Sequence, residues 1–331
     1  MNLQSDVTVT REYGGYLPLE LPKGQEYYRG EHVVALNSGR YAIVYALLDG
    51  GWERIYLPCY LCRTVETAIR RLAPHVDICY YHIDRQFLPM NVHPKKRECI
   101  LWVNYFGIQP ETVIDQMTEI YKGHLILDHT QSFFSVPRDH VYQVYSCRKF
   151  FGVSDGAFLY TDSVMELEER DLSYDRMHYL MGRFEKEASE FYPEYIANNN
   201  LFEEEEIKKI SKLTLNILRG INYKRIRDIR TANFSYLHDI LKKKNKLDLI
   251  VPDGAFMYPL YIEKGNFVRA NLLQDRIYIP TLWPEVVQRC RENEIAYDMA
   301  QNILPLPVDQ RYDVQTMEYI ANKIMEMLEN E

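Results

Sequence analysis

The most informative absences in this 331-residue sequence concern membranes and nucleic acids. Nowhere do eighteen apolar residues follow one another, so no segment is long enough for a transmembrane helix. The first thirty residues contain no basic region followed by an apolar core, which a secretory signal requires. The formal net charge is −8 and lysine and arginine form no dense tract, which argues against a nucleic-acid or anionic membrane partner. We therefore expect a cytoplasmic protein that binds neither.

The sequence also lacks a cysteine framework. Its six cysteines are scattered, which in a chain of this length indicates reduced thiols. Cys59 and Cys62 have the CxxC spacing of a zinc ligand pair or a redox pair. Zinc needs four ligands, and neither a second CxxC nor a spaced histidine pair accompanies this one. We therefore predict no metal site.

The composition is that of a globular protein with a substantial core, since 47% of the residues are hydrophobic and 26% are charged. The length exceeds that of one typical domain, and no internal repeat is visible. We predict a large domain over residues 1–225, whose N-terminal segment can pack on the second domain. A smaller C-terminal domain over residues 226–331 would follow, entered through a long helix that begins at Ile226.

Strands and helices alternate after the first fifty residues. The expected strands cover Arg54–Leu57, Val76–Tyr81, Cys99–Phe106 and Leu125–Leu127, and the expected helices between them cover Thr64–Leu72 and Glu111–Lys122. This order predicts an α/β fold with a mostly parallel sheet flanked by helices, in which ligands bind at the carboxyl ends of the strands. Further helices are expected over Val164–Leu172, Ile207–Leu218, Ile226–Leu241, Pro284–Glu292 and Val314–Leu328, with strands over Tyr258–Glu263 and Arg276–Ile279.

A lysine stands at the centre of the most distinctive stretch, Val141–Tyr160. An apolar run ends at Ser146, Lys149 follows in a glycine-containing turn, and a second apolar run returns, so we predict strand, turn and strand. Lysine is the residue that holds an aldehyde cofactor as a Schiff base. The alternative is that Lys149 is a solvated charge on a turn.

Two further sites carry polar groups where a cofactor would need them. Ser38 and Gly39 open a helix, and the free amides and dipole of a helix N-terminus suit a phosphate, although a plain N-cap is the alternative. Asp128 follows the apolar run Leu125–Leu127, so it emerges at a strand end. A carboxylate there can hold a pyridine nitrogen protonated, or it can cap a turn.

These motifs occur in the order and spacing of a known family. Ser38-Gly39-Arg40, Leu57–Tyr60, Asp128–Gln131 and Ser146–Lys149 together resemble the DegT/DnrJ/EryC1/StrS family, and the likeness extends to Gly14–Tyr16 and Ile303–Tyr312. The family consists of pyridoxal-phosphate-dependent sugar aminotransferases of fold type I. The resemblance therefore covers nearly the whole chain and implies that fold.

The resemblance also implies roles for individual residues. Lys149 would bind the cofactor, pyridoxal 5′-phosphate, covalently and shuttle a proton, and Asp128 would pair with the pyridine nitrogen. The remaining cofactor-binding residues would be Gln131 near the ring oxygen, Tyr60 as a stacking ring, and, around the phosphate, Ser38, Gly39, Arg40 and Ser146.

The chain departs from the family pattern at three places. Many members have a threonine where this chain has Arg40, an aromatic residue where it has Cys62, and a serine five residues before the lysine instead of three. Arg40 and Arg148 would meet an anionic group of the substrate or form structural ion pairs. These departures bear on the substrate.

The resemblance implies an aminotransferase acting on a nucleotide-linked keto-sugar with an amino-acid donor, glutamate being the expected one. The pathway would make a surface polysaccharide or a secondary metabolite. A homodimer is implied as well, with the tyrosine- and methionine-rich stretch after Tyr174 as a contact surface. The alternatives are another pyridoxal-phosphate reaction, such as a dehydration, and a structural or regulatory relative. Retention of Lys149 and Asp128 argues against the last.

Overall fold

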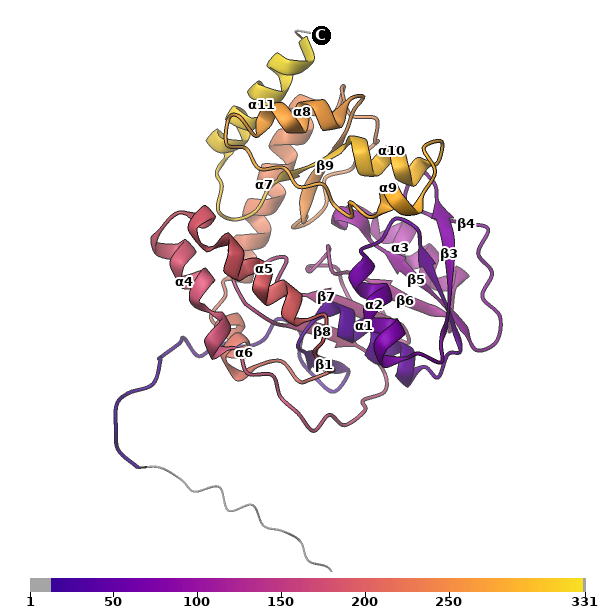
Figure 1. The fold of residues 1–331 in the computed structure, drawn as a ribbon, viewed down its shortest axis with the longest axis vertical. Helices are drawn as coiled ribbons and strands as arrows, with labels where there is room; N and C mark the ends of the chain where they lie inside the picture. Colours follow the sequence, from indigo (N-terminus) through magenta and orange to yellow (C-terminus); the bar gives the residue numbers. More distant parts are fainter. Residues whose placement is uncertain (1–12, 330–331) are drawn as a thin grey trace, which may run out of the picture.

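The computed structural model describes residues 13–329, and an eight-stranded mixed sheet forms its centre (Figure 1). The strand order is β1-β8-β7-β6-β5-β2-β3-β4. The strands are β1 Val33–Leu36, β2 Arg54–Pro58, β3 Asp77–Ile83, β4 Pro89–Met90, β5 Glu98–Val103, β6 Leu125–Asp128, β7 Tyr142–Ser146 and β8 Ala157–Tyr160. From β3 to β7 neighbouring strands are parallel, whereas β8, β1 and β4 pair antiparallel. The predicted mostly parallel sheet is confirmed.

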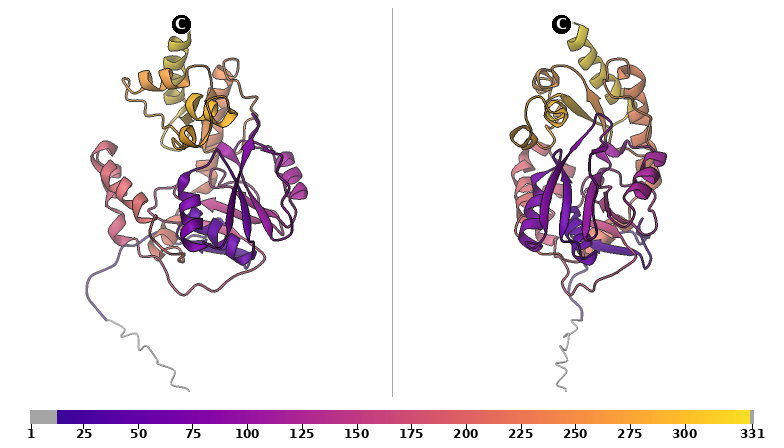
Figure 2. Two further views of the ribbon diagram at one scale, coloured as in Figure 1. Left: turned by 45° about the vertical axis from the view of Figure 1, so that its right-hand side comes forward. Right: turned by 90° about the vertical axis from the view of Figure 1, so that its right-hand side faces the viewer.

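Helices cover both faces of this sheet (Figure 2). On one face lie α1 (Gly39–Asp49) and α2 (Arg63–Leu72), and α3 (Glu111–Ile120) lies on the other. Every residue of α1 from Tyr41 to Leu47 is buried, because this helix is enclosed on all sides. Its uniform apolar sequence therefore reflects its central position in the fold.

The C-terminal part forms a smaller α+β unit above the sheet in Figure 1. Its antiparallel strands are β9 (Met257–Tyr261) and β10 (Ile303–Pro307). Its helices are α7 Tyr223–Leu241, α8 Gly265–Leu272, α9 Val286–Arg289, α10 Ile295–Asn302 and α11 Val314–Glu329. The domain boundary predicted after residue 225 falls inside α7, which runs between the two sheets, and stays a prediction.

The predicted helix over Val164–Leu172 is wrong. The segment is extended, and its backbone pairs with Lys209, which accepts from the amide of Asp171 and donates to the carbonyl of Glu169, both at 2.9 Å. Met165 and Leu167 pack against the core, which is the two-residue period of an extended chain. The spacing of these two side chains is a better guide to the conformation here than the helix propensity of the glutamates in the same segment.

Three other predictions need correction in the C-terminal half. Arg276–Ile279 is not a strand, because Arg276 has a φ of 59° and ends a turn. The helix expected over Pro284–Glu292 shrinks to α9, and the one expected from Ile207 begins only at Lys212, as α6 (Lys212–Arg219). The closing helix α11 is confirmed.

Two further helices stand at the side of the molecule. They are α4 (His178–Glu185) and α5 (Tyr192–Leu201), which Figure 2 shows projecting from the large sheet. Between residues 13 and 329, no helix combines the length and the apolar character that crossing a bilayer requires.

Candidate active site

The ends of two neighbouring strands bring Asp128 and Lys149 together. Asp128 is the last residue of β6, and Lys149 lies three residues beyond the end of the parallel strand β7. Thr130 connects them, since its amide donates to Asp128 Oδ1 at 2.8 Å and its Oγ1 accepts from Lys149 Nζ at 3.4 Å. The predicted strand, turn and strand around Lys149 is confirmed.

The charges of this pair are tuned by their surroundings. Burial raises the pKa of Asp128 and lowers the pKa of Lys149, and the attraction between the two opposes both shifts. Asp128 is only 4% exposed, whereas the side chain of Lys149 keeps solvent-accessible surface although protein surrounds it. Lys149 is therefore no ordinary solvated lysine, because it combines a lowered pKa with access for a small molecule.

The N-terminus of α1 lies beside this pair. A Cβ on Gly39 would come within 3.0 Å of Thr130 Cγ2 and 3.9 Å of Ser146 Cβ, so glycine permits this close approach. Ser38 occupies the N-cap position without a side-chain capping bond, and its buried Oγ has no partner among residues 13–329. Together with the free amides of the first turn, this hydroxyl suits an anionic ligand. The plain N-cap alternative is not observed.

Two arginines add positive charge to the same region. Arg40 donates to the carbonyl of Phe202 at 3.0 Å, and Arg148 lies 5.0 Å from the centre of the Phe202 ring and donates to Asn199. Within the described part of the chain, no carboxylate forms an ion pair with either arginine, and Arg148 Nε is buried without a partner. Burial, aided by the charge of Arg148, lowers the pKa of Arg40. A structural ion pair for these arginines is therefore not observed.

The other predicted site residues lie in different surroundings. Gln131 is buried, and its Oε1 accepts from the amide of Phe106 at 2.6 Å. The ring of Tyr60 is buried against Tyr105 and Trp283, with centroids 5.3 and 4.7 Å away. Cys62, two residues further on, is close enough to Lys149 to favour its charged form. The roles predicted for Tyr60 and Gln131 stay predictions.

His129, directly after Asp128, is buried and stacks on Tyr145 with ring centroids 5.2 Å apart. Burial lowers its pKa to about 3, so the imidazole is neutral at physiological pH. Its Nδ1 lies 3.4 Å from Asn104 Nδ2. His129 thus forms part of the support beneath the site.

The C-terminal part contributes residues that sequence reasoning missed. Lys149 Nζ lies 5.7 Å from the ring centre of Phe256. The carbonyl of Phe150, next to Lys149, accepts from Gln310 Nε2 at 2.7 Å and from Arg230 at 3.5 Å. The guanidinium of Arg230 also lies 4.5 Å from the Phe150 ring centre. No local pattern marks these contacts, because their partners are 80 to 160 residues away in the sequence.

Comparison with protein-family models and with curated protein sequences finds no match. Comparison with solved structures gives many matches, and the three given below are 11 to 13% identical to this chain. A DegT DnrJ EryC1 StrS aminotransferase from Brucella abortus is 13% identical with a TM-score of 0.57, covering 90% of this chain and 86% of its own. NtdA from Bacillus subtilis, with bound cofactor PMP, is 13% identical with a TM-score of 0.59, covering 90% and 73%.

DesI, crystallised in the presence of its TDP-sugar product, is 11% identical with a TM-score of 0.57, and the match covers 89% of this chain and 80% of DesI. At such identities the likeness establishes the fold. The resemblance predicted from the motifs is thereby confirmed at that level: the chain has the fold-type-I architecture of the DegT/DnrJ/EryC1/StrS sugar aminotransferases.

Proposed function

We propose that this protein is a pyridoxal-phosphate-dependent aminotransferase. The observation that carries the proposal is the meeting of three features at one edge of the sheet. An accessible lysine with a lowered pKa faces a buried carboxylate, and both lie beside a helix N-terminus that Gly39 leaves open. Neighbours of the same fold include one with bound PMP, which supports the same cofactor class here.

The residues present fit this cofactor. A phosphate needs several donors and positive charge, and Ser38 Oγ and Arg148 Nε are both buried without a partner in the described chain. The remaining phosphate donors would be the free amides at the start of α1, the guanidinium of Arg40 and the hydroxyl of Ser146. Asp128 would face the pyridine nitrogen, and Cys62 would lie where many family members have an aromatic ring.

When bound, pyridoxal phosphate supplies an aldehyde that takes up an amine and a ring that accepts electrons. The lowered pKa makes the unprotonated form of Lys149 Nζ more available than that of an ordinary lysine, and this form can act as a nucleophile and afterwards move a proton. Thr130 Oγ1 and the Phe256 ring hold that Nζ in place. Burial raises the pKa of Asp128 while Thr130 and Lys149 favour its charged form, and a carboxylate at this position would hold a proton on the ring nitrogen.

Borohydride reduction followed by peptide mass mapping tests the covalent site. We expect the pyridoxyl group on Lys149, and we expect Lys149→Arg to lose both the label and, by roughly 10³-fold or more, turnover. Lys212→Arg, at the exposed start of α6, is the matched control and should keep the label on Lys149. Label on another lysine, or no label after reconstitution, would reject the assignment.

For the substrate we propose a nucleotide-linked keto-sugar, with glutamate as amino donor, in the synthesis of a surface polysaccharide or secondary metabolite. The neighbour DesI, with its TDP-sugar product, supports this class. Arg40 and Arg148 supply charge for a diphosphate or for the cofactor phosphate. The pyridoxamine-phosphate form should react with members of a panel of nucleotide-linked keto-sugars. Reaction with simple 2-keto acids alone would reject the sugar while leaving the cofactor chemistry intact.

We also propose a homodimer. The surface of α4, α5 and the segment before them exposes large apolar side chains, which soluble monomers seldom cluster. They are Leu172, Tyr174, Met181, Phe184, Tyr192 and Tyr195. Sedimentation velocity should show a dimer at micromolar concentration, and a stable monomer with cofactor bound would refute the proposal.

A further inference from the structure

A second group of reactive side chains lies at the same edge of the sheet, near β3. Cys59 directly follows β2, and Cys290 directly follows α9, 231 residues later. Arg289 ties the two segments together by donating to the carbonyls of Cys59 and Leu61 at 3.2 and 3.1 Å. The side chain of Cys290 lies close enough to that of Cys59 for the two sulfurs to share a hydrogen.

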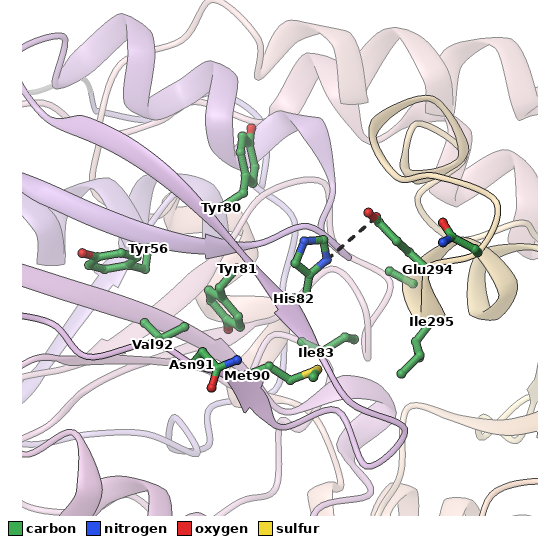
Figure 3. Close-up of a pocket in the computed structure, with 12 residues that line it drawn as sticks. Tyr56, Tyr80, Tyr81, His82, Ile83, Met90, Asn91, Val92, Glu294 and Ile295 are labelled. Atoms are coloured by element: carbon green, nitrogen blue, oxygen red, sulfur yellow. Dashed lines mark ion pairs between the residues drawn. The ribbon is translucent and has the colours of Figure 1, made fainter.

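A histidine completes this group. His82, in β3, places Nδ1 3.6 Å from Cys59 Sγ and 3.8 Å from Glu294 Oε2, and Figure 3 shows the histidine and glutamate facing each other. The hydrogen bond from Cys290 and the nearby His82 lower the pKa of Cys59 to about 7. Such a thiol is partly thiolate, the form that reacts with oxidants.

Cys62, the other half of the CxxC motif, takes no part in this pair. Its Sγ lies 3.1 Å from Thr64 Oγ1, at the start of α2. The structure therefore pairs Cys59 with a cysteine from the distant C-terminal part instead of its sequence neighbour. Within residues 13–329, no three metal-ligating side chains are arranged to hold a metal ion, so a zinc site does not account for the cluster.

A pocket leads to the cluster. It has a volume of about 570 Å³ and is lined by residues of β3, β4 and α10, among them His82, Met90 and Glu294 (Figure 3). The two thiols themselves are only 3% and 7% exposed, whereas the His82 side chain is 58% exposed. Lys149 follows β7, four strands away, which is roughly 19 Å at about 4.8 Å per strand. The pocket thus opens beside His82, whose ring contacts Cys59, and away from Lys149.

We infer that Cys59 and Cys290 are a redox modification site that forms a reversible disulfide between the end of β2 and the end of α9. With a peroxide as the oxidant, both thiols lose a proton and an electron. An S–S bond forms, the O–O bond breaks, and two molecules of water leave. The inference rests on residues outside the proposed aminotransferase machinery and does not depend on it. Disulfides of intracellular proteins are usually transient or redox-sensing in this way.

Hydrogen peroxide treatment of the full-length protein, followed by alkylation and peptide mass mapping, tests this inference. We expect oxidation to remove two of the six free thiols, to link the peptides of Cys59 and Cys290, and to be reversed by dithiothreitol. Cys59→Ser and Cys290→Ser should each abolish the linked peptide. Cys79→Ser, which changes a cysteine in the same strand as His82, should keep it.

Several outcomes would overturn the inference. A Cys59–Cys62 linkage would show that the sequence neighbours pair instead. Sulfinic acid on Cys59 without a linked peptide would show an oxidisable thiol with no partner. Zinc retained after dialysis of the reduced protein, with both thiols protected from alkylation, would show a metal site. Because the readout on the wild-type protein needs no variant, a variant that fails to fold does not weaken the test.

Discussion

The two reactive clusters share one edge of the sheet but differ in what surrounds them. At the centre, after β6 and β7, an exposed lysine lies beside a buried carboxylate, and the attraction between their charges opposes the pKa shifts that burial causes. Near the margin, Cys59 and Cys290 are buried, and the exposed imidazole of His82 lies between Cys59 and an open pocket. The parallel strands place reactive side chains at this edge in both cases. The reactive lysine at the centre is therefore open to a ligand, whereas the two thiols at the margin are buried and the neighbouring histidine is exposed.

The largest effect should come from removing the charge at the central cluster. Asp128→Asn preserves the shape but not the negative charge, so we expect cofactor binding to Lys149 to persist while turnover falls roughly 10³-fold. Visible absorbance of the reconstituted variant, measured beside single-turnover kinetics, checks both parts. Near-normal turnover would show that Asp128 only caps a turn and would erase the contrast between the two clusters.

A smaller effect should follow from loosening the support of Lys149. Arg230, in α7, donates to the buried carbonyls of Ala255 and Phe256 and reaches Phe150, although burial lowers its pKa to about 10. Arg230→Met leaves those carbonyls without donors, so we expect the free energy of unfolding to fall by about 2–4 kcal/mol. Denaturant titration followed by circular dichroism measures this change.

The control for that experiment lies one turn away in the same helix. Arg227 forms an ion pair with Asp253 at 3.4 Å and is 35% exposed, so Arg227→Met should cost less than about 1 kcal/mol. Equal losses for the two variants would mean that the contacts of Arg230 are no more stabilising than a surface ion pair.

The smallest expected effect is a change in the pH at which the thiol of Cys59, in the marginal cluster, becomes ionised. Thiolate, not thiol, reacts with iodoacetamide, so the rate at Cys59 should rise with pH and reach half its maximum near pH 7. An ordinary thiol with a pKa of about 8.5 would be only about 3% ionised at that pH. Cys290→Ala removes the hydrogen-bond donor and should move the midpoint upward. An unchanged midpoint would show that Cys290 does not stabilise the thiolate.

Much of the central cluster, which contains Lys149, Asp128 and Ser38, was predictable from the sequence, because local sequence patterns mark each of these residues. Ser38 was predicted from its place at the start of a helix, and no strand was expected before it. Lys149 and Asp128 each lie at the end of a strand that an apolar run marks clearly, so their shared edge followed from the topology. The same logic succeeded for β2, β3, β5 and β6. It failed over Val164–Leu172, where pairing with Lys209 determines the conformation, a long-range effect that no local pattern reveals.

In the marginal cluster, too, local sequence patterns do not reveal a long-range contact. The CxxC motif drew attention to Cys59 and Cys62, yet the partner of Cys59 comes from α9. Likewise, Phe256 and Gln310 reach the Lys149 segment only through the packing of the C-terminal part. The spacing of residues in the sequence does not predict these contacts, because they form only when two distant segments pack against each other.

The hydrogen bond from Gln310 to the carbonyl of Phe150 joins residues 160 positions apart. During synthesis on the ribosome, the turn that carries Lys149 emerges long before that partner exists. The large sheet can begin to form early, but the lysine receives its final anchor only when β10 and the residues after it have been made. This hydrogen bond is therefore among the last contacts that the growing chain can form, and a truncation before residue 310 would leave the carbonyl of Phe150 without it.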